Sequence, residues 1–380
     1  MNIIFNIQSL QYPLTGIGWY TRYLLKGLQE HECINQLICI PDFKKNNLII
    51  KKNIISESNI KKIIKYFPGT YSVLNNYRNA RFIKQTRFLV EDKFIYHEPC
   101  YVLKPYSGPK ICTIHDLSHI HYSKYHPKER VRYLMRNLPI TINNADHIIT
   151  GSSFIRNELI NYFKIPPYKI TSIYHGVSKL FRPRSFNDVR NVLLHYNLHY
   201  KSYLLSVGTL EPRKNLERLI QAFSSLSEKQ RKEYPLVLIG MKGWQSHRLE
   251  KMIQSLIKKG QLYCLGYIPE TDLPYLYSGA YAFVYISIYE GFGLPLLEAM
   301  ASGIPTLASS ESAMPEVVGE AAMLVNPFDI DRITEQLNQL INNLTLRDRL
   351  KKLGPIQAAK FSWESCIEST IEVYKKTLNN

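Results

Sequence analysis

The stretch AFVYISIYEGFGLPLLEAMASGIPTLAS, residues 282–309, decides how the chain is expected to fold. Its apolar beginning at 282–286 is typical of a buried strand, and the letters EGFG at 290–293 form a turn rich in small residues. Pro295 suits the first helical position because its missing N–H would have no partner there, and Gly303 suits the end of that helix. We therefore expect a strand, a glycine loop and a helix in direct succession.

A glycine loop that leads into a helix predicts an anion site, since free N–H groups and the positive end of the helix dipole face the same point. Glu290 precedes this helix and would lie near the group beyond a phosphate. Glu298 lies one turn into the helix, where a carboxylate could accept two hydrogen bonds from a vicinal diol such as ribose. Either glutamate alone could be an ordinary charged residue. Together with the glycines they favour a nucleotide-sugar site, whose phosphate-facing amides would belong to Gly291, Phe292, Gly293 and Leu294.

Short apolar runs alternate with helical patterns along nearly the whole chain, which is typical of parallel sheets with crossover helices. Because 380 residues exceed the size at which one core keeps growing, we expect two domains. The fold class is therefore α/β, with two Rossmann-like doubly wound domains facing each other across a cleft. The expected domains are 1–182 and 183–360, with an irregular linker at 177–190. Residues 361–380 are expected to form a helix that crosses back to the N-terminal domain.

The segment YEGFGLPLLEAMA at 289–301 resembles glycosyltransferase family 4, whose hallmark is two glutamates separated by seven residues. The resemblance continues through SGIPT at 302–306 and PEVVG at 315–319. It implies a GT-B fold and a retaining transfer of a hexose from a nucleotide-sugar to a hydroxyl of a saccharide or lipid-linked saccharide. In that family the second glutamate, here Glu298, holds the ribose. The first, here Glu290, contacts the donor sugar.

A second motif, GTLEPRKN at 208–215, lies between an expected strand and helix. Arg213 and Lys214 are adjacent cations there, which could stabilise a leaving diphosphate, and Asn215 is a suitable N-cap. The segment looks like the family's diphosphate-binding loop. Some members carry an arginine directly after the glycine; this chain has Thr209, so Arg213 would supply the second positive charge. A solvated basic turn is the alternative.

Two motifs of the first half are expected to complete the site. The loop TGIGWY at 15–20 follows the first strand, and in the family a similar loop with glycines such as Gly16 and Gly18 approaches the donor phosphates or the acceptor. His115 ends another expected strand in an HDL context, and the family's histidine contacts the transferred sugar. Asp116 could orient the His115 ring or cap the following turn. His97, at a similar strand end, ranks lower.

The donor is expected to be GDP-mannose, because GTLEPRKN looks like the mannosyltransferases of polysaccharide assembly; UDP-glucose and UDP-GlcNAc stay open. The base would be read near Ile268, largely by backbone groups. We expect no metal and no cofactor beyond the co-substrate. The pair Asp329 and Asp331 is not expected to bind a metal, because it stands at a helix start, where aspartates serve as caps. A non-catalytic family member is a rival interpretation, which the intact glutamates and cations oppose.

Basic residues are concentrated in the first half, and residues 44–90 contain eleven Lys or Arg against the single acid Glu57. Ile60, Ile63, Ile64 and Phe67 recur there at helical spacing between lysines, which predicts an amphipathic basic helix on an anionic membrane or, alternatively, a helix of the core. Nucleic-acid binding is not expected, since no nucleic-acid-binding motif accompanies the charge. The six cysteines show no metal spacing. We expect a cytoplasmic protein, peripheral on a membrane if the basic segment binds one.

Overall fold

The computed structural model describes residues 1–41, 70–90, 93–241, 243 and 247–379. In the described residues, the N-terminal domain has six strands and the helices between them. The strands are β1 (Asn2–Asn6), β2 (Gln36–Ile40), β3 (Ile95–Glu98), β4 (Lys110–Ile114), β5 (His147–Thr150) and β6 (Ile170–Ser172). The helices are α1 (Gly16–Glu30), α3 (Thr70–Thr86), α4 (Ser118–His121), α5 (Lys128–Asn144) and α6 (Ser153–Phe163), with 3-10 turns η1 (Arg87–Leu89), η2 (Ser123–Tyr125) and η3 (Pro167–Lys169).

The C-terminal domain repeats this plan. Its strands are β7 (Leu204–Val207), β8 (Leu236–Ile239), β9 (Leu262–Gly266), β10 (Ala282–Tyr285), β11 (Thr306–Ser309) and β12 (Met323–Val325). Its helices are α7 (Phe186–His195), α8 (Leu216–Ser224), α9 (Glu228–Glu233), α10 (His247–Lys258), α11 (Leu273–Gly279), α12 (Leu294–Ala301), α13 (Met314–Val318), α14 (Ile330–Asn342) and α15 (Leu344–Ala358), with the 3-10 turn η4 (Pro212–Lys214). The last helix is α16 (Trp363–Asn379).

Both sheets are parallel and doubly wound. The strand orders are β2-β1-β3-β4-β5-β6 and β12-β11-β10-β7-β8-β9. In each sheet there is one point at which the direction of strand addition reverses, between β1 and β3 in the first sheet and between β10 and β7 in the second. A strand at each of these points leads into a loop of the candidate site. Ligands of such sheets bind at these points, beyond the carboxyl ends of the strands. The two Rossmann-like domains expected from the sequence are confirmed.

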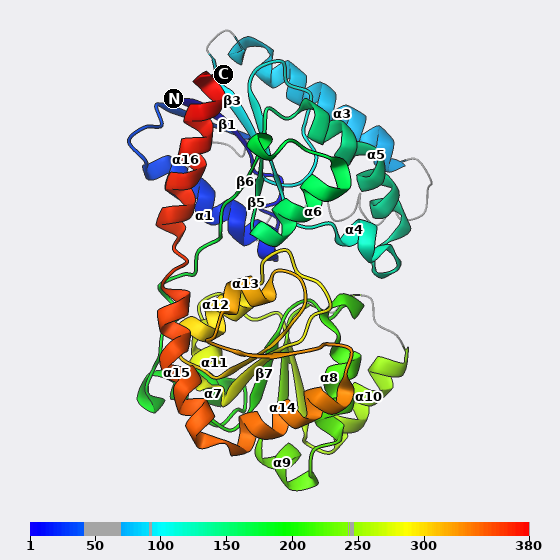
Figure 1. Ribbon diagram of the computed structural model, residues 1–380, viewed down its shortest axis with the longest axis vertical. Helices are drawn as coiled ribbons and strands as arrows, with labels where there is room; N and C mark the ends of the chain where they lie inside the picture. The colour runs from blue at the N-terminus through cyan, green and yellow to red at the C-terminus, as the bar shows by residue number, and fades with distance from the viewer. Residues whose placement is uncertain (42–69, 91–92, 242, 244–246, 380) are drawn as a thin grey trace.

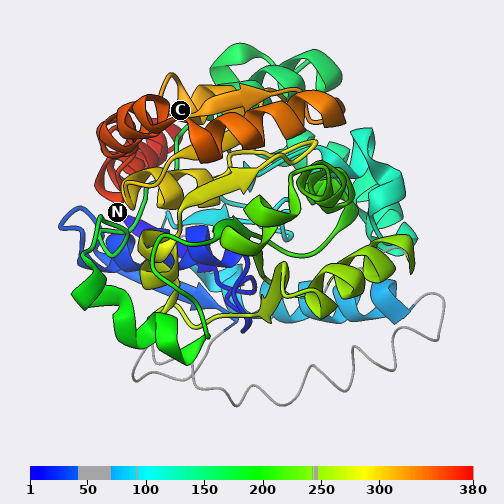
Figure 2. The ribbon, with the colours of Figure 1, turned by 90° about the horizontal axis from the view of Figure 1, so that it is seen from below.

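Each sheet is covered by helices on both faces (Figures 1 and 2), and the strand sequences explain why. Successive side chains of a strand point to opposite faces. In β10, Phe283 and Tyr285 belong to one core cluster together with α11 and α12. Ala282 and Val284 belong to another cluster, together with α8 and α14. A strand that is buried on both faces needs this continuous apolar run.

The last helix, α16, packs against α1 in the N-terminal domain, so that the two chain ends lie near each other in Figure 1. Trp363, Ile371 and Tyr374 of α16 are buried in the same cluster as β1 and α1. The chain therefore passes between the domains twice. The two passages lie side by side, because Val177 N–H donates to the Phe361 carbonyl over 3.2 Å.

One part of the expected linker is helical. The segment 177–190 shows no apolar periodicity, yet α7 begins inside it at Phe186. Ser185 caps this helix: its hydroxyl accepts from Asp188 N–H, and the Asp188 carboxylate accepts from Ser185 N–H over 2.9 Å. This reciprocal capping starts the helix without an apolar stripe at its beginning, so the expectation of irregular chain was wrong from residue 186 onward.

Candidate active site

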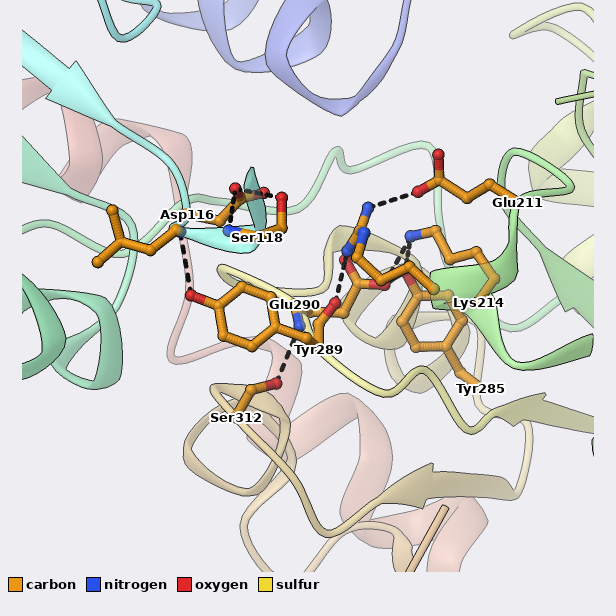
Figure 3. A network of polar contacts seen from close by, with 10 residues as sticks. Asp116, Ser118, Glu211, Lys214, Tyr285, Tyr289, Glu290 and Ser312 are labelled. Carbon is orange, nitrogen blue, oxygen red and sulfur yellow. Dashed lines mark hydrogen bonds and ion pairs between the residues drawn. The ribbon is translucent and has the colours of Figure 1, made fainter. Parts of the chain in front are cut away.

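The carboxylate of Glu290 lies at the centre of a polar network that the C-terminal domain builds after β7 and β10 (Figure 3). Lys214 Nζ donates to Glu290 Oε1 over 2.6 Å, and Arg213 Nη1 donates to Glu290 Oε2 over 2.9 Å. The Tyr285 hydroxyl also donates to Oε1, over 2.9 Å. Arg213 reaches a second carboxylate, Glu211, over 2.8 Å. Two adjacent cations and two glutamates thus form one compensated cluster.

The charges of this cluster are buried, and each depends on the others. Burial alone would raise the pKa of Glu290, but the Arg213 guanidinium and the Lys214 ammonium outweigh it and lower the pKa to about 2. Burial lowers the pKa of Lys214, and Glu290 opposes that shift. The Nε of Arg213 is buried and has no hydrogen-bond partner among the described residues.

Asn215 positions the two cations, although not in the way the sequence suggests. It stands before α8 with a positive φ of 60°, and its side chain makes no capping bond. Instead, its amide Nδ2 donates to the carbonyls of Ile286 over 3.1 Å and Pro327 over 2.6 Å. Asn215 thus occupies the expected N-cap position of α8, but its side chain does not make the capping hydrogen bond. The side chain ties the turn that carries Arg213 and Lys214 to the end of β10.

The glycine loop at 290–293 leads directly into α12, as expected. Gly293 has a positive φ of 106°, which favours glycine, and Pro295 lies in the first turn of the helix. Glu290 N–H donates to the Ser312 hydroxyl over 2.9 Å, which anchors the loop to the segment after β11 (Figure 3). The Phe292 side chain belongs to the domain core. Because its side chain packs in the core, Phe292 can face a donor only with its backbone.

Glu298, one turn into α12, accepts a hydrogen bond from the Tyr277 hydroxyl over 2.8 Å. Burial raises the pKa of Glu298 to about 7, and the Tyr277 bond only partly opposes that shift. A carboxylate held this way has lone pairs left for other hydroxyl groups. The Ile268 side chain lies in the core cluster of this domain, so a base could be read there through the backbone.

Replacing Glu298 by glutamine is expected to stabilise the ligand-free protein by about 3 kcal/mol at pH 8 and by less than about 1 kcal/mol at pH 5. The folded-state pKa of about 7 lies above the ordinary value of 4.5. The folded state therefore holds the proton more tightly, and its stability falls as the pH rises from 4.5 through 7, whereas glutamine carries no charge to bury. Thermal unfolding at both pH values measures this, and equal shifts at pH 5 and pH 8 would contradict it.

His115 and Asp116 follow β4 in the N-terminal domain. His115 Nε2 bonds the Pro99 carbonyl over 2.8 Å, and burial lowers the pKa of the ring, which leaves Nδ1 as an acceptor. Asp116 does not orient that ring. Its Oδ1 accepts from Ser118 N–H over 3.0 Å and from the Ser118 hydroxyl over 2.8 Å, so it caps the next turn. Burial would raise the pKa of Asp116, but Arg213 of the other domain, the two hydrogen bonds from Ser118 and Arg130 together outweigh it and hold the pKa below its usual range.

The structure brings His115 and the glycine loop into contact. A Cβ atom on Gly291 would lie 1.8 Å from the His115 carbonyl oxygen, so only glycine fits there. Leu294, at the start of α12, packs against the N-terminal cluster that contains Leu14. Gly18 in turn packs closely on Leu14, while Gly16 opens α1 with free space around it. His97 lies elsewhere, buried between the Tyr374 hydroxyl at 2.6 Å and the Thr113 hydroxyl at 2.8 Å.

Several residues of the network were not found from the sequence. Glu211 stands inside the motif GTLEPRKN, so its spacing to Arg213 could have indicated an ion pair. Nothing in the order of residues indicates that tyrosines contact the glutamates, because the partners come from different elements. The residues found only in the structure are Glu211, Tyr277, Tyr285, Tyr289 and Ser312.

Other sequence expectations are only partly covered by the described residues. The Asp329 carboxylate accepts from Arg332 N–H over 2.9 Å and caps α14. Among the described residues, no group of three His, Cys, Asp or Glu side chains could hold a metal ion. The candidate basic helix around residues 60–67 lies outside the described residues. None of the helices in the described part of the chain is long and apolar enough to cross a membrane.

Comparison with known proteins supports the assignment of both domains. Residues 14–179 match the family described as Glycosyltransferase Family 4, and residues 197–356 match Glycosyl transferases group 1. The chain is 37% identical over 379 residues to O-antigen chain mannosyltransferase B of Escherichia coli, covering 99% of this chain and 100% of the relative. It is 25% identical to O-antigen chain mannosyltransferase RfbU of Salmonella typhimurium, covering 86% and 87%.

Solved structures show the same fold. WaaG, a glycosyltransferase involved in lipopolysaccharide biosynthesis, superposes with a TM-score of 0.70 at 14% identity, covering 98% of this chain and 99% of that one. Anabaena Alr3699/HepE, solved in complex with UDP and glucose, gives 0.73 at 15% identity, covering 99% and 100%. With both domains matched and a mannosyltransferase similar over the full length, the chain belongs to glycosyltransferase family 4 and is a glycosyltransferase of the GT-B fold.

Proposed function

We propose that the protein transfers a mannosyl residue from GDP-mannose to a saccharide hydroxyl, with retention at the anomeric carbon, during assembly of a polysaccharide such as an O-antigen. The preference for mannose is supported by the full-length similarity to an O-antigen chain mannosyltransferase. A further relative, the MMP alpha-(1->4)-mannosyltransferase of Mycolicibacterium hassiacum, is 32% identical over 237 residues. In this proposal the transfer reaction needs no metal and no cofactor beyond the nucleotide-sugar co-substrate.

One observation carries the chemistry: Arg213 and Lys214 meet Glu290 beside the N-terminus of α12. A departing nucleoside diphosphate develops negative charge, and preorganised cations in a buried site stabilise such charge strongly. In this proposal the diphosphate oxygens bind the two cations and the free N–H groups of the glycine loop. Glu290 then accepts hydrogen bonds from hydroxyls of the sugar, and Glu298 accepts those of the ribose.

A panel of donors tests this proposal. Transfer to a mannan-type oligosaccharide should be fastest with GDP-mannose, and UDP-glucose, UDP-GlcNAc and GDP-glucose serve as competitors. GDP at about a hundred times its dissociation constant should stabilise the protein by about 2.7 kcal/mol, which thermal unfolding detects. Preference for a UDP-sugar would overturn the choice of donor. No transfer and no hydrolysis with any donor would overturn the proposed reaction and favour a non-catalytic family member.

We also propose that the protein binds an anionic membrane surface through the N-terminal domain, and that it does not bind nucleic acid. Residues 70–90 contain four basic residues and no acid. The exposed side chains of Arg81, Lys84 and Arg87 stand beside the exposed Ile83 and Phe88, which are 46% and 66% accessible. Basic and apolar groups on one surface suit lipid headgroups.

Sedimentation with vesicles tests the membrane proposal. The protein should cosediment with phosphatidylglycerol vesicles at low salt, should bind neutral phosphatidylcholine vesicles weakly, and should lose binding in Arg81→Glu/Arg87→Glu. Binding that ignores vesicle charge and these substitutions would refute it. Retention on DNA or RNA in place of vesicles would also refute it.

A further inference from the structure

Helix α6 of the N-terminal domain contacts the glycine loop of the other domain through its cap. Ser152 is the N-cap residue, and its hydroxyl oxygen accepts from Ile155 N–H over 3.3 Å. The same hydroxyl donates to the carbonyl of Gly291 over 2.7 Å. The loop that carries Glu290 is thus hydrogen-bonded to the first turn of a helix in the opposite domain.

A carboxylate from the C-terminal domain completes this first turn. Glu316, in α13, accepts from Ser153 N–H over 2.7 Å and from Phe154 N–H over 3.1 Å. The Tyr174 hydroxyl donates to it as well, over 2.6 Å. The first N–H groups of a helix have no partners inside the helix, and its dipole favours a negative charge there. One domain therefore supplies the cap of a helix in the other.

Tyr289 makes the third contact with α6, and it directly precedes Glu290. Although it belongs to the C-terminal domain, its ring is 3% accessible and lies in a hydrophobic cluster of the N-terminal domain. Its hydroxyl accepts from Leu117 N–H over 3.0 Å and donates to the Glu158 carboxylate in the second turn of α6. His121 Nε2 lies 3.2 Å from Oε1, the other carboxylate oxygen of Glu158.

We propose that α6 is the docking site of the donor loop, and that Tyr289, Glu158 and Glu316 are positioning residues for the transfer reaction. The inference rests on the proposed function and adds to it. The cations, Glu290 and Glu298 all belong to the C-terminal domain, so donor binding there does not need α6. Transfer also needs the acceptor side, where His115 lies. The three contacts hold the loop that carries Glu290 against the end of β4, where Gly291 meets the His115 carbonyl, and a displacement of about 1 Å can lower a rate about a hundredfold.

Tyr289→Phe tests the inference because it removes the hydroxyl and keeps the ring. We expect kcat to fall at least about tenfold, while the dissociation constant of GDP stays within about twofold. Small-angle scattering should show a larger radius of gyration for the ligand-free variant than for the parent. The matched control is Tyr281→Phe, at the other end of β10, whose hydroxyl donates to the Ile341 carbonyl over 2.7 Å inside the same domain. It should change neither kcat nor scattering.

A second variant keeps the inference testable if Tyr289→Phe fails to fold. Glu316→Gln keeps the shape of the cap and removes its charge, so it should lower kcat and leave GDP binding in place. Parental kcat and parental scattering in both variants would overturn the docking role. If the parent itself transfers no sugar, the proposed function fails, and scattering alone then decides the docking role. An equal loss of kcat and GDP affinity would also overturn it, since that pattern indicates damage to the donor site.

Discussion

Lys214→Met is expected to lower kcat by about 10²- to 10³-fold. The substitution keeps most of the aliphatic side chain and removes the ammonium that donates to Glu290 over 2.6 Å and to the Tyr285 hydroxyl over 2.7 Å. In the proposed reaction this charge stabilises the leaving diphosphate, which is most negative as the glycosidic bond breaks. Steady-state kinetics with the preferred donor measures the loss, and kcat should fall more than the affinity for the nucleotide.

Lys201→Met separates this effect from general destabilisation. Lys201 is another partly buried lysine of the same domain, and its Nζ donates to the carbonyls of Ser278 over 2.7 Å and Ala280 over 3.0 Å. Its loss should lower the unfolding temperature and leave kcat close to that of the parent. If both lysine variants lost activity in proportion to their stability, Lys214 would have no specific part in the reaction.

Gly291→Ala is expected to lower transfer by about a hundredfold, because the added methyl group separates the domains where they must meet. A Cβ at this position would lie 1.8 Å from the His115 carbonyl oxygen and 3.2 Å from the Asp116 Cβ. Either the end of β4 or the glycine loop must yield, which displaces His115 or Glu290. Single-turnover transfer measures the change directly.

The matched control for Gly291→Ala is Gly108→Ala, in a loop of the N-terminal domain. Its added methyl group would lie 2.7 Å from the ring of Tyr106, a buried side chain of the same domain. We expect this variant to lose some stability and to keep its transfer rate. Parental transfer by Gly291→Ala would show that the close approach of the two loops is not needed for the reaction.

The sequence predicted the layers of the fold well because that information is local. Short apolar runs predicted the parallel strands, and one such run forms β8 (Leu236–Ile239). The glycines and proline after β10 predicted the loop and the start of α12, since positive φ and a missing N–H are properties of single residues. The start of α7 was missed, because its signal is a capping pair and not an apolar stripe.

By itself, the sequence determined the residue types of the site, its elements and the family: two glutamates with seven residues between them, adjacent cations and a glycine loop. Only the tertiary structure decided which charges meet. It paired Arg213 and Lys214 with Glu290, bonded the Asn215 side chain to the carbonyls of Ile286 and Pro327, and placed the Tyr289 ring in a cluster of the other domain. Caps, turns and strands follow from neighbouring residues, whereas these contacts join residues far apart in the chain. Their geometry is set by how the two sheets and α6 pack, which no single segment of the sequence contains.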